Sequence, residues 1–171
     1  YSSSLKMIWG TYYGGDDYEW GNDLATDIKG YVYLLGTTKS YNSNGSVKEI
    51  IATKDAFIEY LQGGTDAFLV KFDQKGKRIF STYFGSLGND YGNGLSHGRY
   101  GDVYLCGETN SNRNLVFRPY QSTYGGSVDA FFADLYYCKL KAFLNADSVC
   151  VGEELSLSCA DSSVYKDTSS N

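Results

Sequence analysis

The chain has 171 residues, of which 42% are apolar, 16% aromatic and 20% charged, and this composition excludes disorder along most of its length. Its 15 basic and 20 acidic residues give a net charge of −5 and form no basic cluster, so we expect no nucleic acid as a partner. No apolar stretch reaches the roughly 18 to 20 residues of a membrane helix, and we expect no direct membrane insertion.

Tyrosine and glycine are unusually abundant. The sequence has 17 Tyr and 20 Gly but only one Pro. Aromatic side chains favour strands, and Gly favours the tight turns that join them, so we predict an all-β protein. Because the chain begins with Tyr1 rather than Met, we expect it to be a segment of a longer protein.

Apolar runs separated by Gly, Asp and Asn predict four strands in the first half of the chain. They lie near 21–27, 31–37, 66–73 and 78–84. A run that resembles the fourth strand precedes them, at about 6–13. The runs 31–35 and 68–70 are almost continuously apolar, which is typical of strands covered on both faces.

The second half of the chain repeats the first. The run IWGTYYGG from Ile8 recurs as IFSTYFGS from Ile79, and GYVYLLG from Gly30 recurs as GDVYLCG from Gly101. Both pairs have the same spacing along the chain. The repeat predicts three further strands, near 92–98, 102–108 and 129–136.

A four-stranded antiparallel unit that repeats and is covered on both faces is typical of a β-propeller blade. We therefore predict a propeller segment over 1–138 with about two blades, repeat 1 near 6–84 and repeat 2 near 79–136. Propellers have roughly four to eight blades, so this is a fragment of a larger ring. The remaining blades would come from the same parent chain or from partner chains.

Three motifs resemble the bacterial SBBP-type β-propeller repeat: WGTYYGGDD from Trp9, GNDLATD from Gly21 and DAFLVKFD from Asp66. The resemblance covers about 6–136 and departs from the family pattern at 96–99 and 133–135. It implies a large secreted or surface-attached protein, of the Bacteroidetes type that often uses type IX secretion, in which the repeat has a scaffold or binding role.

The segment 139–171 is predicted to be a linker followed by the start of a β-sandwich module. Residues 147–159 resemble the opening of an immunoglobulin-like or PKD-like domain. Cys150 and Cys159 flank a strand-like run, and a disulfide between them in an oxidising compartment would require the chain to bend.

The sequence contains no recognisable catalytic constellation, and we predict a protein that is not an enzyme. His97 is the only histidine. Its neighbour Ser96 would point to the opposite face of a strand, so the two would not form a nucleophile–base pair. We expect His97 to be a structural residue.

An acidic loop offers a calcium site as the one candidate cofactor site. It contains Asp16, Asp17 and Asp23, with Glu19 between them. Oxygen ligands suit Ca²⁺, but the spacing does not follow an EF-hand loop. The alternative is that these side chains cap their own turns.

The two loops within the repeats differ in length, since Asp66 and the equivalent Asp129 are closer together in the sequence than the other repeated pairs. Loops on a rigid scaffold can vary without disturbing the core, so 37–65 and 108–128 are the best places for a binding site. Tyr and Arg are enriched at binding hot spots, and the candidates here are Tyr41, Tyr60, Arg113, Arg118, Tyr120 and Tyr124. Alternatively, the aromatic residues in the loops fill gaps between blades, as Phe57, Phe117 and Tyr120 could do.

Three functions remain open at this stage. The first is a non-enzymatic binding, adhesion or scaffold segment of a secreted or cell-surface multidomain protein, with a protein or glycan ligand. The second is a structural spacer or a subunit of a fibre or surface layer. The third is the non-catalytic part of a secreted glycan-active enzyme.

Overall fold

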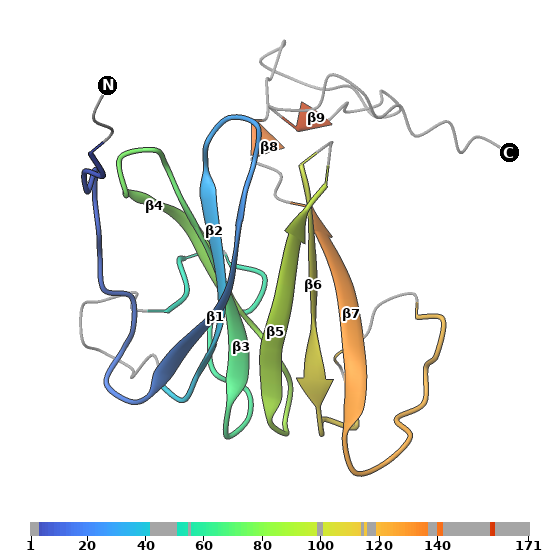
Figure 1. Cartoon of the computed structure of the whole chain (residues 1–171). Helices are drawn as coiled ribbons and strands as arrows, with labels where there is room; N and C mark the ends of the chain where they lie inside the picture. The colour runs from blue at the N-terminus through green and yellow to red at the C-terminus, as the bar shows by residue number, and fades with distance from the viewer. Residues whose placement is uncertain are drawn as a thin grey trace, which may run out of the picture.

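The computed structural model describes residues 4–41, 51–54, 56–98, 101–113, 115, 119–136, 140–141 and 158–159. These residues form antiparallel sheets, and none of them belongs to a helix (Figure 1). Accordingly, no helix in the described part of the chain is long and apolar enough to cross a membrane.

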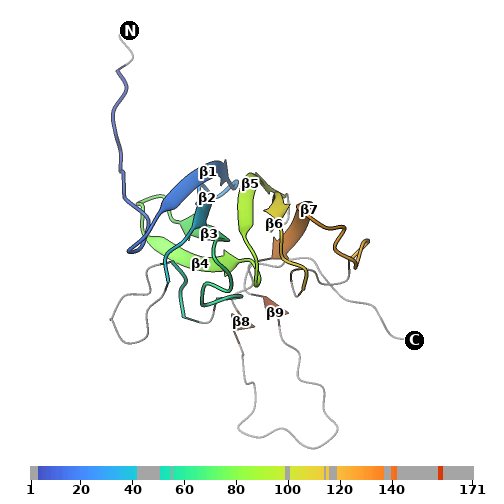
Figure 2. The ribbon, with the colours of Figure 1, turned by 90° about the horizontal axis from the view of Figure 1, so that it is seen from below.

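Two larger sheets make up the body of the structure. The four-stranded sheet, which we call blade 1, has the order β1 (Glu19–Thr26), β2 (Val32–Thr38), β3 (Asp66–Phe72) and β4 (Arg78–Phe84). The three-stranded sheet, blade 2, has the order β5 (Asp90–His97), β6 (Asp102–Thr109) and β7 (Asp129–Tyr136). Seen from below, the strands of each sheet form a separate row, with β5 next to blade 1 (Figure 2). The predicted all-β fold, with two consecutive sheets rather than one continuous sheet, is confirmed.

A third, two-stranded sheet pairs β8 (Leu140–Lys141) with β9 (Ser158–Cys159). Most of the predicted C-terminal module lies outside the described residues. So does Cys150, and the predicted disulfide between Cys150 and Cys159 therefore stays a prediction.

The predicted strand at 6–13 is wrong, because these residues form no strand in the structure. A segment of the β4 type needs a strand of the β3 type beside it. In blade 1, β3 is already paired on both edges, with β2 and β4. Instead, Trp9 and Tyr13 pack against blade 1, with their rings 6.0 Å and 5.8 Å from that of Phe72.

Each of the two hairpin turns of blade 1 runs from an Asp to a Gly. Asp27 Oδ1 accepts hydrogen bonds from the backbone N–H groups of Lys29 and Tyr31, at 2.9 Å and 3.0 Å. Gly30 closes that turn with a φ of 76°, a left-handed conformation that favours glycine. The turn between β3 and β4 is built in the same way around Asp73 and Gly76.

Residues alternate between two faces of each blade, and the main core lies between the blades. We call the face of blade 1 that packs on blade 2 its forward face, and the opposite face its rear face; the repeat defines the same faces in blade 2. The core joins the forward face of blade 1 to the rear face of blade 2, and consists of Tyr33, Leu35, Ala67, Leu69, Phe84, Val103, Leu105 and Phe131. Hydrogen bonds also cross between the blades, from Asn22 Nδ2 to the carbonyl of Gly92 and from the N–H of Leu95 to Asp23 Oδ2.

A second core covers the rear face of blade 1. Its buried members from the sheet are Phe68, Val70, Phe72 and Tyr83, and the loop between β2 and β3 adds Ile51, Ala52 and Leu61. Trp9 and Tyr13 pack against the same cluster. The long loop of the first repeat therefore contributes directly to the core.

Candidate functional site

A pocket of about 450 Å³ opens beside the end of β4. The first variable loop provides most of its lining, the end of β4 and the following turn provide its base, and the second variable loop adds one side chain. The lining residues are Ala56, Phe57, Ile58, Glu59, Tyr60, Gln62, Phe84, Gly85, Ser86 and Leu115.

The loop that forms the pocket is fixed to the outer edge of β4. The N–H of Thr53 donates to the carbonyl of Ser81 at 3.0 Å, and the N–H of Tyr83 donates to the carbonyl of Ile58 at 3.0 Å. Thr82 Oγ1 accepts a hydrogen bond from the N–H of Ile58 at 2.9 Å. These bonds satisfy an edge strand that would otherwise be open to other chains, and they hold the pocket wall in place.

Aromatic side chains stand exposed at the pocket. Phe57 is 67% exposed and Tyr60 is 52% exposed. The ring of Phe57 stacks on that of Phe84, with centroids 6.5 Å apart and planes at 22°. Exposed rings held on a rigid base offer a flat apolar surface to a ligand.

Polar groups lie next to these rings. Glu59, an acidic residue, and Gln62, an amide residue, are among the residues that line the pocket. Ser86 belongs to the base, where its Oγ donates to the carbonyl of Arg113 at 2.6 Å and its N–H donates to Asp90 Oδ2 at 2.7 Å. The pocket thus combines an apolar platform with hydrogen-bonding groups, which is typical of small-ligand sites.

Two fully buried carboxylates lie behind the pocket. Asp66 Oδ2 accepts a hydrogen bond from the N–H of Gln62 at 2.7 Å, which ties the pocket wall to the start of β3. Burial, together with the nearby charge of Asp90, raises the pKa of Asp66 to about 7. Of the buried side-chain oxygens in the described residues, Oδ1 of Asp66 and Oδ1 of Asp90 are two that have no hydrogen-bond partner.

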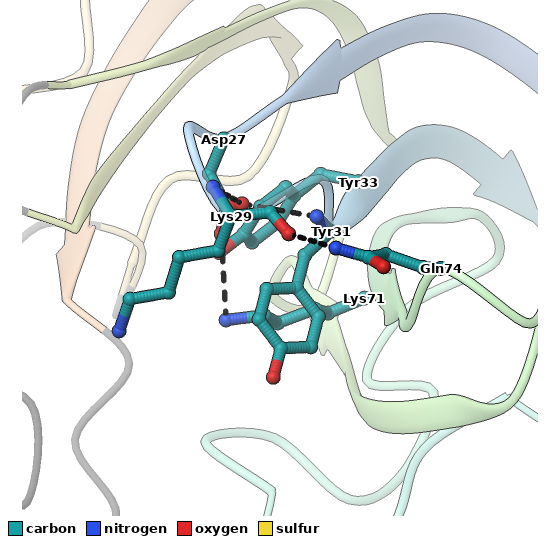
Figure 3. A network of polar contacts seen from close by, with 6 residues as sticks. All are labelled: Asp27, Lys29, Tyr31, Tyr33, Lys71 and Gln74. Atoms are coloured by element: carbon teal, nitrogen blue, oxygen red, sulfur yellow. Dashed lines mark hydrogen bonds and ion pairs between the residues drawn. The ribbon is translucent and has the colours of Figure 1, made fainter.

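A second polar cluster lies near the β1–β2 turn (Figure 3). The Nζ of the buried Lys71 lies 3.9 Å from Asp27 Oδ2, and 4.4 Å and 5.0 Å from the ring centroids of Tyr31 and Tyr33. Gln74 Nε2 donates to the carbonyl of Lys29. The cluster joins the two turns of blade 1 and compensates the charge of a buried lysine, so we interpret it as structural.

The predicted binding residues do not form one site. Tyr60 lines the pocket, and Arg113 reaches it only through its backbone carbonyl. Tyr41 and Tyr120 are exposed away from the pocket lining, and Tyr124 donates its hydroxyl to the carbonyl of Ser127 at 2.5 Å. Arg118 and Phe117 lie outside the described residues.

The acidic loop does not form one ligand set. Both oxygens of Asp23 accept backbone N–H groups, from Leu24 and Leu95, and Asp17 Oδ1 accepts that of Tyr18. Within the described ranges, no group of three or more His, Cys, Asp or Glu side chains is placed to hold a metal ion. The local hydrogen bond of Asp17 agrees with the turn-capping alternative, whereas Asp23 lies within β1 and connects the two blades through Leu95. These two residues and Asp16 do not meet at a common centre.

Sequence reasoning missed Glu59, Gln62 and Phe84 as pocket residues. Phe84 belongs to a strand, and only the three-dimensional return of the loop to the end of β4 brings it to the pocket. The difference in loop length marked both variable loops, 37–65 and 108–128, without distinguishing between them. The ring centroid of His97 lies 5.3 Å from that of Tyr33, so this histidine takes part in the packing of the two blades.

Comparison with known families agrees with this architecture. Two segments, residues 8–42 and 79–113, match the family model of the SBBP β-propeller repeat. Each match covers the first two strands of one sheet, and the second match also includes most of β4, the last strand of blade 1. The family repeat is therefore offset by one strand from the sheets of the structure. The two sheets are therefore described as propeller blades. No curated protein matches the chain.

Proposed function

We propose that this chain is a non-enzymatic binding module of a secreted or cell-surface protein, and that its pocket binds a carbohydrate ring. The observation that carries the proposal is the pairing of two exposed aromatic side chains, Phe57 and Tyr60, with the hydrogen-bonding groups of Glu59 and Gln62 in one pocket. A sugar has one apolar face of C–H groups and a rim of hydroxyls. The first suits an aromatic ring, and the second suits a carboxylate and an amide.

The position of the pocket supports this proposal. Its walls come from the variable loops and its base from β4, so different loops could change the ligand without altering the blades. The expectation that the parent protein is secreted or displayed on a surface follows from the repeat resemblance, and a glycan is a common ligand in such locations.

The experiment is a screen on a glycan array, followed by calorimetric titration of the best ligand. Tyr60→Ala and Phe57→Ala should each weaken binding at least about tenfold, since stacking contributes on the order of 1 kcal/mol or more per ring. Tyr120→Ala is the matched control, because Tyr120 is 108% exposed in the other variable loop and does not line the pocket.

Two results would count against the proposal. Absence of saturable binding to any glycan would contradict the proposed ligand class. Equal losses of affinity in Tyr60→Ala and Tyr120→Ala would show that the pocket is not the binding site. A thermal melt of each variant separates loss of binding from loss of folding, which matters because Phe57 also packs on Phe84.

A second candidate is a structural role, as a spacer or a subunit of a larger assembly. The observation that favours it is the exposed forward face of blade 2, where Phe132 is 70% exposed. The two functions use different surfaces and are compatible.

A further inference from the structure

The interface between the two blades shows what a blade of this kind packs against. The repeat relates β1 and β2 to β5 and β6 at one constant spacing, and β3 to β7 at a shorter spacing because the second loop is shorter. Each residue of blade 1 in the interface therefore has an equivalent in blade 2. Where that equivalent is exposed, the interface predicts what should cover it.

The forward face of blade 2 is such an exposed surface. Leu69 is 3% exposed in blade 1, whereas its equivalent Phe132 is 70% exposed in blade 2. Leu35 is completely buried, whereas its equivalent Cys106 is exposed. Tyr104 stacks on Phe132, with ring centroids 5.9 Å apart, and no described residue covers the pair as blade 2 covers blade 1.

Blade 2 also has an open edge. In blade 1, β3 pairs with β4, and Leu69 lies opposite Thr82. In blade 2, β7 is the last strand of the sheet, and no strand among the described residues pairs with its outer edge. An unpaired edge of this length is a template for strand addition.

The segment before β1 lies where the fourth strand of a preceding blade would lie. Tyr13 is the equivalent of Phe84. Phe84 packs on Phe131 of the next blade at 5.3 Å and 37°, and Tyr13 packs on Phe68, the equivalent of Phe131, at 5.3 Å and 41°. The segment therefore makes the contacts of a fourth strand with the blade that follows it, but pairs with no strand among the described residues.

The connection to β1 supports the same assignment. Glu19 accepts the N–H of Gly15, as Asp90 accepts that of the equivalent Ser86. Unlike β4, which pairs with β3, the segment has no neighbouring strand among the described residues. Tyr12 is 103% exposed, whereas its equivalent Tyr83 is completely buried.

We propose that copies of this chain associate head to tail, with residues 7–13 of one protomer adding to β7 of its partner as the missing fourth strand. The register of β3 and β4 fixes the expected register: Phe132 lies opposite the partner's Thr11, and Ala130 opposite the partner's Tyr13. The forward face of blade 2 then lies against the rear face of the partner's blade 1.

This arrangement makes a strand of residues 7–13 and keeps the existing contacts of blade 1. Tyr13 keeps its contact with Phe68, while strand addition pairs the β7 edge and covers both Tyr12 and Phe132. It also uses the part of the rear face that remains accessible, where Leu24 is 59% exposed and its equivalent Leu95 is packed against the core between the blades. A head-to-tail interface forms a ring if its rotation closes, so two to four protomers would give roughly four to eight blades.

A cross-link tests the register. The double variant Thr11→Cys/Phe132→Cys should form a disulfide between protomers, identified by mass spectrometry of the linked peptides. Both cross-linking variants carry Cys106→Ser, because Cys106 is a free cysteine directly opposite residue 132 in the β6–β7 pair and would compete for the new thiol. A link between residues 11 and 132 within one protomer is not expected, because residue 11 lies on the rear side of blade 1 and residue 132 on the forward face of blade 2. Tyr12→Cys/Phe132→Cys is the matched control and should link poorly, because adjacent residues on a strand point to opposite faces.

Sedimentation of the full chain over a wide concentration range tests the association itself. We expect oligomers of two to four protomers that Phe132→Glu dissociates at least tenfold more readily. Ile28→Glu should leave them unchanged, because Ile28 is equally apolar and 92% exposed but lies in the β1–β2 turn. A chain that stays monomeric throughout would overturn the proposal. So would dimers that Phe132→Glu disrupts but that lack the 11–132 link, since these would join two forward faces to each other.

Discussion

Blade 1 has four strands and both of its faces are covered, whereas blade 2 has three described strands and an exposed forward face. The two sheets come from the same repeat, so the difference lies in their neighbours. Blade 1 has blade 2 in front and the segment with Trp9 and Tyr13 behind it. Burial in this protein is therefore a property of a blade's position in the stack as well as of its sequence.

The two blades also differ in the charged residues at equivalent positions. In blade 1, Lys71 lies close to Asp27 and two tyrosine rings. In blade 2, the equivalents of Lys71 and Asp27 are Asp134 and Gly98. Partial burial, together with the charge of Asp102, raises the pKa of Asp134. A cation held between aromatic rings has been replaced by two neighbouring carboxylates.

The largest expected effect concerns Asp66. Its folded-state pKa of about 7 exceeds the ordinary value of 3.8, so the folded protein binds more protons than the unfolded chain between these values. The free energy of unfolding should therefore fall as pH rises through this window, by up to about 4 kcal/mol. Asp66→Asn should remove this decline and raise stability at pH 8, measured by urea denaturation at several pH values.

Asp129→Asn is the matched control in blade 2. Asp129 accepts a hydrogen bond from the N–H of Gly125, as Asp66 accepts one from the N–H of Gln62. Asp129, however, is only half-buried. A wild-type free energy of unfolding that does not decline between pH 4 and pH 7 would contradict the burial of the Asp66 carboxylate.

The next largest change in stability is expected at one of two equivalent apolar residues, Leu69 in blade 1 and Phe132 in blade 2. Leu69→Ala should lower the free energy of unfolding by about 3 kcal/mol, because it leaves a cavity between the blades. Phe132→Ala should change it by less than about 0.5 kcal/mol in the monomer, since the ring is mostly exposed. Urea denaturation at low protein concentration measures both. Equal losses would mean that the two forward faces are buried alike.

The smallest expected change in stability concerns Lys71 and its equivalent in blade 2, Asp134. Lys71→Ala should destabilise the fold by about 2 kcal/mol, because it leaves the carboxylate of Asp27 without its cation. Asp134→Ala should be neutral or slightly stabilising, since it relieves repulsion from Asp102. Thermal melts of both variants test this comparison. A larger loss of stability for Asp134→Ala than for Lys71→Ala would contradict this prediction.

The sequence was sufficient to predict the seven strands of the two blades, because the internal repeat supplies most of the strand patterns twice. It failed at 6–13, which has the residues of a fourth strand but no sheet to join. Strand formation depends on a partner, and a local pattern does not show whether one is present.

The site was predictable only in part. Loop length marked both variable loops, one of which forms most of the pocket, but composition gave Tyr60 the same weight as Tyr41 and Tyr120, which do not line it. Which of the loop's side chains face the pocket depends on the hydrogen bonds that fix Ile58 to β4. Such long-range contacts leave no pattern in the sequence.

The packing of blade 1 on blade 2 is the central claim, and the ring of His97 tests it most directly. His97 is the only histidine, so its ring protons are readily assigned by nuclear magnetic resonance, and its ring centroid lies 5.3 Å from that of Tyr33 in the other sheet. We predict nuclear Overhauser effects between these two rings. Their absence, together with cross-strand effects that join β4 directly to β5 in one sheet, would contradict the account.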